Sequence, residues 1–240
     1  MRSFMLLVGM GTALIAAGCA RAVPTLPLAQ AAARNDLDAV RNLIAGRHPV
    51  DERDADGFTA LMWAARQSAV LGMAALLDAG ADVEARDTRN EWTALQHAVH
   101  TRQVDAVRVL LDRGADPNAR IHSAASTPLL MAAGDRDPAI VKLLLAHGAD
   151  ARHQGEWGDT PLARAVSGGP FLDVDRPLLG GCRAETVRAL LAHDPALRLP
   201  DNFAGRSALA WARLHLVTEN DDRELCAEVL QLLDKGKGFS

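Results

Sequence analysis

The stretch Gly57-Phe-Thr-Ala-Leu-Met-Trp-Ala-Ala65, followed by Leu76-Leu-Asp-Ala-Gly-Ala-Asp-Val83, decides the fold because both parts recur along the chain. A Leu-Leu or Leu-Ile pair begins at Leu43, Leu76, Leu110, Leu144, Leu190 and Leu232. Successive pairs are 33, 34, 34, 46 and 42 residues apart. A period of this length is typical of a solenoid of stacked units. We therefore predict six units between about residues 26 and 235, of which the last two carry insertions.

Each regular unit has the same start and stop signals. A hydroxyl residue precedes the first apolar stretch, at Thr59, Thr93, Thr127, Thr160 and Ser207. Such a hydroxyl accepts a backbone N–H as a helix N-cap. Glycine follows the second stretch at Gly80, Gly114 and Gly148, where a left-handed residue ends a helix without a Cβ penalty. The predicted unit is a hairpin turn and two helices, both too short to be stable without stacking.

These repeated stretches resemble ankyrin repeats, with further copies at Leu110-Leu-Asp-Arg-Gly-Ala-Asp-Pro-Asn-Ala119 and Ser126-Thr-Pro-Leu-Leu-Met-Ala-Ala133. The resemblance extends over about residues 26–235, nearly all of the mature chain. It implies an all-α ankyrin-repeat solenoid of about six helix-turn-helix units with short hairpin fingers. It also implies recognition of another protein through a concave surface made of hairpin tips and first helices. Ankyrin folds have no enzymatic activity in common, so the resemblance implies no catalysis.

The resemblance assigns the contact positions to residues that flank each turn and follow each Ala-Ala pair. They are Asp56, Phe58, Arg66, Gln67, Asn90, Trp92, His100, Thr101, Ser126, Asp135, Trp157, Asp159 and Ser167. Phe58 and Trp92 have two interpretations, because large aromatic rings serve as interface anchors and also pack between neighbouring hairpins. Trp63 and Trp211 have helix-core spacing, and we expect both to be buried.

The N-terminus has the features of an export signal. Met1-Arg2 is followed by an uncharged apolar stretch and by small residues before Cys19, so residues 1–18 are interpreted as a signal peptide. The segment before Cys19 resembles a bacterial lipobox, which implies that Cys19 is lipidated. Because Ala20 follows Cys19, the resemblance also implies that the lipid anchors the protein in the outer membrane, on the side that faces the periplasm. Residues 19–27 would form a tether. Ordinary cleaved export and an uncleaved anchor remain as alternatives.

The repeat domain is assigned to residues 28–235, with an insertion at 169–182 and a tail at 236–240. The insertion is unusually long and apolar for a linker, so it either folds back on the solenoid or binds something. Aligning the leucine pairs places Cys226 level with Ala184, only two residues from Cys182, so neighbouring second helices are expected to bring the two cysteines close. In an oxidising compartment they are expected either to form a disulfide or to remain small buried side chains.

The composition favours a protein partner. With 26 basic and 30 acidic residues the net charge is −4, and no long basic run supports nucleic-acid binding. No phosphate loop, nucleophile elbow or metal-ligand set is present, so neither catalysis nor a cofactor or metal is expected. We expect a monomeric periplasmic adaptor, inhibitor or stabiliser of a client protein. A structural envelope component and a small-molecule or metal carrier are the alternatives.

Overall fold

The computed structural model describes residues 23–121, 126–134, 137–167, 182–217 and 223–235. Within these ranges the chain forms twelve helices and no named strand. The helices are α1 (Pro27–Ala33), α2 (Leu37–Ala45), α3 (Ala60–Arg66), α4 (Val70–Asp78), α5 (Ala94–His100), α6 (Val104–Asp112), α7 (Pro128–Ala133), α8 (Pro138–Ala146), α9 (Pro161–Ser167), α10 (Ala184–His193), α11 (Phe203–Val217) and α12 (Arg223–Lys235).

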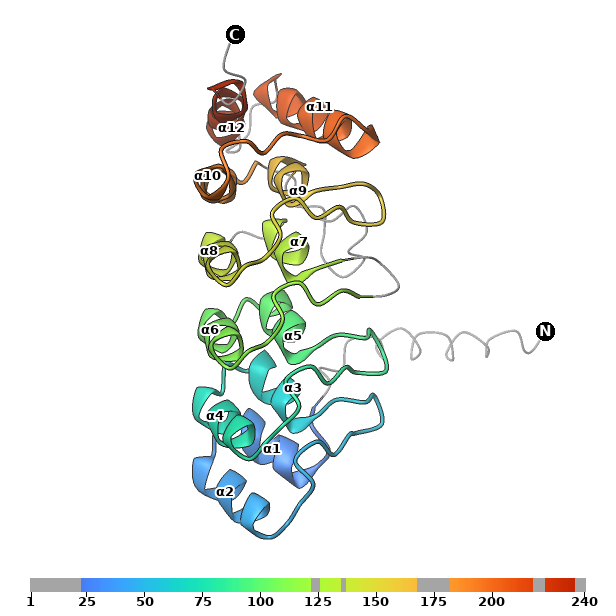
Figure 1. Ribbon diagram of the computed structural model, residues 1–240, viewed down its shortest axis with the longest axis vertical. Coiled ribbons are helices and arrows are strands. Elements are labelled where there is room, and N and C mark those ends of the chain that lie inside the picture. Colours follow the sequence, from blue (N-terminus) through green and yellow to red (C-terminus); the bar gives the residue numbers. More distant parts are fainter. Residues whose placement is uncertain (1–22, 122–125, 135–136, 168–181, 218–222, 236–240) are drawn as a thin grey trace, which may run out of the picture.

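The twelve helices pair into six units that stack in one direction (Figure 1). Odd-numbered helices form an inner row and even-numbered helices an outer row, and each helix packs on its counterpart in the next unit. The segments that lead into α3, α5 and α9 project beside the inner row as fingers (Figure 1). The predicted all-α repeat solenoid is confirmed.

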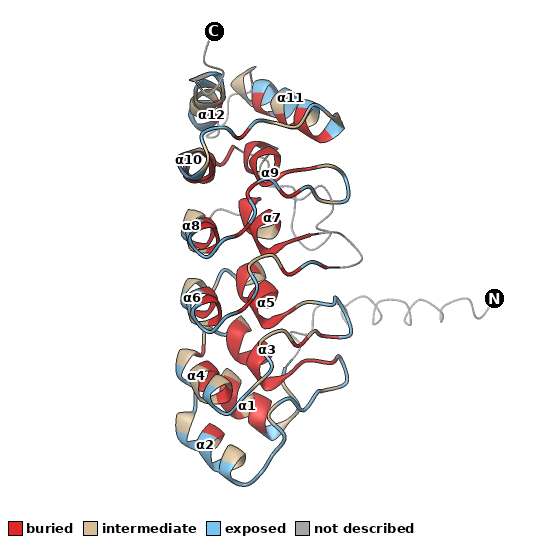
Figure 2. Ribbon diagram, in the orientation of Figure 1, coloured by how far each residue is buried: buried red, intermediate tan, exposed pale blue. Residues whose placement is uncertain are grey.

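The core runs along the stack between the two rows (Figure 2). The first leucines of the four central pairs, Leu76, Leu110, Leu144 and Leu190, are fully buried. Burying one such side chain contributes about 1.5–3 kcal/mol relative to leaving it exposed. Leu43 and Leu232 are only half-buried because they lie in the two end units, which each have one neighbour. The periodic leucines therefore mark the shared core.

The helix boundaries follow the expected capping chemistry. The hydroxyls of Thr59, Thr93, Thr127 and Thr160 accept the backbone N–H three residues later, at 3.2–3.4 Å. Gly80, Gly114 and Gly148 share a φ of +86° just after the outer helices. The N–H groups of the residues that follow these glycines bond back to Leu76, Leu110 and Leu144 at 3.0 Å, which ends the helices.

The last unit departs from the predicted pattern. Ser207 lies inside α11 instead of at its start, because α11 begins four residues earlier at Phe203. The Asn202 side chain accepts the Gly205 N–H at 3.0 Å and takes over the role expected of Ser207. The expectation that Trp211 is buried is also wrong: it is 37% exposed. Trp211 belongs to α11, the last inner helix in the described ranges.

The C-terminal outer helix is joined covalently to the preceding unit. Cys182 and Cys226 form a disulfide with 5.0 Å between their Cα atoms, and both side chains are buried. Besides Cys226, α12 fully buries only Val229 among its described side chains. The disulfide is therefore a major attachment of α12.

Of the predicted insertion, residues 169–181 lie outside the described residues, as do Cys19 and the signal segment. No helix in the described ranges is long and apolar enough to cross a membrane.

Candidate protein-binding site

The first two fingers are each organised by one aspartate. Asp54 accepts the backbone N–H groups of Asp56 and Phe58 on one oxygen and the Trp63 indole N–H, at 2.9 Å, on the other. Asp87 holds the equivalent place 33 residues later, where one oxygen accepts two backbone N–H groups of its own turn. In both fingers a carboxylate thus joins the turn to the following inner helix.

A buried histidine connects the second finger to the preceding unit. The side chains of His97 and Asp87 are both fully buried, and His97 Nε2 lies 2.8 Å from Asp87 Oδ2. His97 Nδ1 lies 3.4 Å from Nη1 of Arg66. Since a guanidinium can only donate, Nδ1 is the acceptor and Nε2 carries the proton that is donated to Asp87. Arg66 and Asp87 together select the neutral tautomer of His97.

The electrostatics agree with this assignment. Burial lowers the pKa of His97 below its ordinary value, and Arg66 acts in the same direction, although the hydrogen bond that His97 donates to Asp87 opposes the shift. Burial alone would raise the pKa of Asp87, but the hydrogen bonds from His97 and the turn outweigh it and the pKa is lowered. A neutral imidazole therefore sits beside an ionised carboxylate.

Aromatic rings surround His97 on both sides. The Phe58 ring lies 4.7 Å from the imidazole and 5.1 Å from the Trp63 ring, measured between centroids. On the other side the Trp92 ring lies 5.2 Å from His97 and 4.9 Å from His100. The rings are tilted relative to one another, an arrangement favoured by their quadrupoles. The cluster extends across the junction between the second and third units.

Arg66 covers the outer side of this cluster. Its guanidinium carbon lies 5.7 Å from the centroids of both Phe58 and Trp63, within the range of cation–π attraction. Arg66, Trp92 and His100 are half-buried, and the adjacent Gln67 is exposed. We call these four residues the Arg66 surface. Its arginine and tryptophan are held in place from beneath and still reach solvent.

The predicted contact residues differ in exposure. Asp56, Gln67, Asn90 and Trp157 are exposed, and Trp157 is 63% exposed on the finger that precedes α9. Thr101 and Ser167 are half-buried, and their hydroxyls donate to carbonyls of their own helices. Only the residues of the Arg66 surface come together around one cluster.

Three predicted contact residues are buried, which corrects the expectation that they face a partner. Phe58 is 4% exposed because Trp63, Arg66 and His97 enclose it, so packing between hairpins is the interpretation that applies. Ser126 is buried where its backbone pairs with Ile121. Asp159 turns inward and forms an ion pair with Arg164. Asp135 lies outside the described residues.

The roles of Asp87 and His97 were not found from the sequence. One signal was available: Asp54 and Asp87 are 33 residues apart, and each is followed by a hydrogen-bond donor at the fourth position of the next inner helix, Trp63 or His97. This recurrence marks the carboxylates as structural residues of the fingers. The predicted core position of Trp63, which is 2% exposed, is confirmed.

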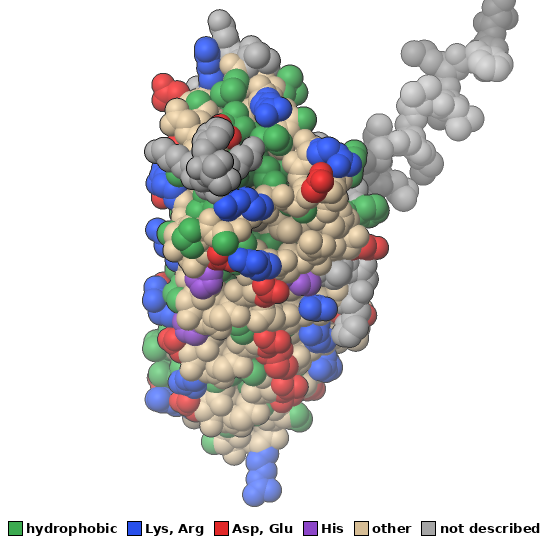
Figure 3. Space-filling view, turned by 45° about the horizontal axis from the view of Figure 1, so that its top comes forward, with side chains coloured by type: hydrophobic (Ala, Val, Ile, Leu, Met, Phe, Trp, Pro, Cys, Tyr) green, Lys and Arg blue, Asp and Glu red, His purple; other side chains and the backbone are tan. Residues whose placement is uncertain are grey.

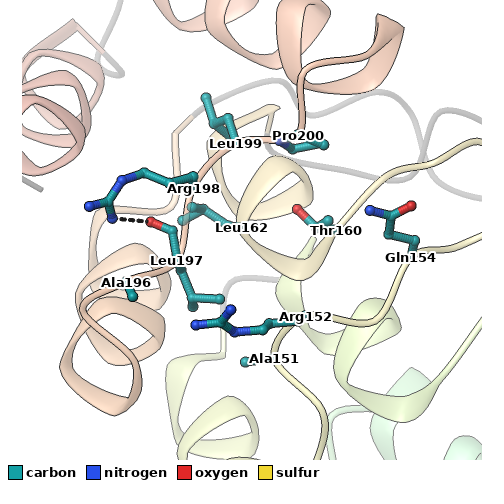
Figure 4. Close-up of a pocket in the computed structure, with 10 residues that line it drawn as sticks. All are labelled: Ala151, Arg152, Gln154, Thr160, Leu162, Ala196, Leu197, Arg198, Leu199 and Pro200. Atoms are coloured by element: carbon teal, nitrogen blue, oxygen red, sulfur yellow. Dashed lines mark hydrogen bonds between the residues drawn. The ribbon is translucent and has the colours of Figure 1, made fainter. Parts of the chain in front are cut away.

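A pocket of about 340 Å³ lies near the C-terminal end, between the segment that leads into α9 and the segment between α10 and α11 (Figure 4). Arg152, whose guanidinium donates twice to Asp194, and Gln154 line one side, and Leu197 and Pro200 line the other. The described residues of the lining include no carboxylate, imidazole or thiol, so they supply no nucleophile–base pair of the kind that acyl transfer requires.

The surface carries both signs of charge. Figure 3 shows acidic and basic side chains interspersed, without a continuous basic stripe on the face in view. In the described part of the chain, no three His, Cys, Asp or Glu residues are grouped so that they could hold a metal ion. The arrangement offers contact chemistry: a planar cation, partly exposed rings and exposed amides.

These repeated units define the class of protein. A family model of three tandem ankyrin repeats matches residues 28–121, and a model of a single ankyrin repeat matches residues 126–155. Together they cover just over half of the chain, and the chain belongs to the ankyrin-repeat family. No curated protein matches the chain. Ankyrin repeats are generally non-enzymatic interaction modules that typically bind another protein.

Proposed function

We propose that the protein is an exported adaptor, inhibitor or stabiliser that holds a client protein on its inner helices and fingers. The observation that carries this proposal is the Arg66 surface. Arginine and tryptophan are the residue types most enriched among side chains that dominate binding energy. Here both are immobilised by the buried cluster before any partner arrives, which reduces the entropy lost on binding.

The location outside the cytoplasm is part of the same proposal. The disulfide between Cys182 and Cys226 supports it, because structural disulfides persist mainly in oxidising compartments. The apolar N-terminal segment before Cys19 gives independent support. We propose that lipidated Cys19 anchors the protein to the outer membrane, so that the solenoid acts in the periplasm.

Purification of clients from solubilised envelopes tests the binding function. Trp92→Ala removes the ring at the edge of the cluster, and Gln67→Glu places a carboxylate beside Arg66 without disturbing a buried group. We expect each change to weaken the affinity for a client by about tenfold or more. Arg108→Ala, on the exposed side of outer helix α6, is the matched control and leaves binding unchanged.

The affinity of each recovered client is then measured by calorimetry, and thermal unfolding shows that every variant is folded. If the clients bind Trp92→Ala and Gln67→Glu as tightly as they bind the unmodified protein, the Arg66 surface is not the binding site. If neither the unmodified protein nor Arg108→Ala retains any client, that result would favour a purely structural role in the envelope.

A further inference from the structure

Arg66 is a half-buried cation that forms no ion pair with any described residue. Its guanidinium lies over the Phe58 and Trp63 rings. Within the described ranges the guanidinium has one hydrogen-bond partner, His97 Nδ1, at 3.4 Å. A guanidinium carries five N–H donors in a planar fork. Most of the Arg66 donors therefore have no acceptor from the described part of the protein.

The two buried or half-buried carboxylates of the neighbouring fingers are already engaged. Asp54 accepts N–H groups of its own turn and the Trp63 indole N–H. Asp87 is fully buried and accepts the His97 N–H together with N–H groups of its own turn. Neither carboxylate forms an ion pair with Arg66. A surface cation over two filled fingers can gain most from an anion that a partner brings.

A second arginine adds positive charge beside Arg66. Arg89 is exposed on the second finger and forms no ion pair with a described residue. Burial lowers the pKa of Arg66, Asp87 opposes that shift, and Arg89 adds to it. Asp56 and Glu91 are exposed on the same two fingers, but the charges that shift the pKa of Arg66 are those of Asp87 and Arg89. Two guanidiniums and one carboxylate leave an excess of one positive charge.

We propose that the client presents an aspartate or glutamate side chain whose carboxylate pairs with the Arg66 guanidinium, and beside it an apolar side chain that packs on Trp92. This inference rests on the proposed function, because it names the chemistry that the Arg66 surface recognises. His97 contacts both Arg66 and Trp92, so one short client segment can reach both side chains. Gln67 offers an exposed amide at the end of the same helix.

A carboxylate matches this position in charge and in shape. One carboxylate balances the single excess positive charge, whereas a phosphate monoester carries roughly −1.5 to −2. The planar fork of a guanidinium binds a carboxylate through two parallel N–H···O bonds. Because the rings beneath Arg66 already hold its side chain, little rotamer freedom is lost when the pair forms. The pair therefore contributes to both affinity and specificity.

Selection of short random peptides, displayed without a free carboxyl terminus, on the full exported chain tests this chemistry. We expect the enriched peptides to share an acidic residue close to an apolar or aromatic one. The peptides are then synthesised with both ends blocked, so that only a side chain can supply the carboxylate. Calorimetry should show that replacing the shared acidic residue by its amide weakens binding at least about tenfold.

Variants of the protein show whether Arg66 receives this carboxylate. Arg66→Gln keeps a donor for His97 Nδ1 but removes the charge, and for this variant the acid and amide peptides should bind within about twofold of each other. Arg89→Gln, at an exposed position, should weaken the acid peptide about threefold and leave the amide peptide unchanged. Arg108→Gln on α6 is the matched control and should alter neither affinity. Thermal unfolding checks that each variant is folded.

The outcomes separate this inference from the proposed function. Peptides that Trp92→Ala weakens but that share no acidic residue would overturn the inference and leave the proposed function standing. An acid peptide that Arg66→Gln and Arg89→Gln bind as tightly as the unmodified protein does would also overturn it. So would the absence of any enriched peptide, because the inference requires a linear acidic segment. The purification of clients from envelopes decides the proposed function in each case.

Discussion

At the residue scale, one buried pair determines which side chains of the site reach solvent. Asp87 accepts hydrogen bonds from its own finger and from His97, while His97 also contacts Arg66 of the preceding unit. Phe58 and Trp92 precede equivalent threonines, yet only Phe58 is enclosed. The difference depends on the next unit, where His97 packs on Phe58. The sequence could not predict it, because burial at one position depends on residues one repeat away.

Removing the Asp87 carboxylate should destabilise the protein strongly. Asp87→Ala leaves the His97 N–H and several finger N–H groups without their acceptor, and we expect a loss of about 3 kcal/mol in the free energy of unfolding. Urea denaturation measures this loss. Asp56→Ala, at an exposed position on the preceding finger, is the control and should change stability by less than about 0.5 kcal/mol. Equal losses in both variants would contradict the assigned role of Asp87.

The same pair should make stability depend on pH. Because the native pKa of His97 is lowered, the unfolded chain binds more protons than the native chain below about pH 6.5, and stability falls as the pH is lowered. The lowered pKa of Asp87 adds a further loss below about pH 4. His97→Gln keeps a donor for Asp87 but does not titrate. Its unfolding free energy should therefore fall less than that of the unmodified protein between about pH 7.5 and pH 5.5. An identical fall in the unfolding free energy of His97→Gln and of the unmodified protein would show that His97 does not contribute to the pH dependence.

At the scale of elements, the regular units could be predicted because each helix carries its own boundary signals. Thr59 and Thr93 cap helices as expected, and Gly80 and Gly114 end them. The last unit could not be predicted in the same way. It lacks the Gly-Ala-Asp turn, and Asn202 supplies an earlier cap that lengthens α11. Helix α12 is attached by the disulfide as well as by packing on α10 and α11.

Loss of the disulfide should therefore act locally on the C-terminal unit. The bond joins residues 44 apart, for which the chain-entropy account gives a stabilisation of about 4 kcal/mol. In Cys182→Ser/Cys226→Ser protein we expect faster amide exchange in α11 and α12, with α5 unchanged as an internal reference. Thiol titration under denaturing conditions provides an independent check on the exported protein. Two free thiols would contradict the pairing.

At the scale of the whole molecule, the proposed client-binding surface lies along the inner row of helices. Its proposed position in the cell depends on Cys19, which lies outside the described residues. If Cys19 is lipidated, Cys19→Ser should move the protein from the membrane fraction to the soluble periplasmic fraction. Immunoblotting of separated fractions measures the change, with Cys226→Ser as a cysteine control that retains the anchor. Unchanged membrane association of Cys19→Ser would exclude lipidation there.

We propose that a protein partner binds across the inner helices at the Arg66 surface. Photocrosslinking in cells tests it most directly, with a benzophenone amino acid placed at Gln67 or, as the control, at Arg108 on the outer row. Both positions are exposed, so either probe can react with a protein in contact. We predict a discrete protein adduct from Gln67 and none from Arg108. An adduct from Arg108 alone, or none from Gln67, would contradict it.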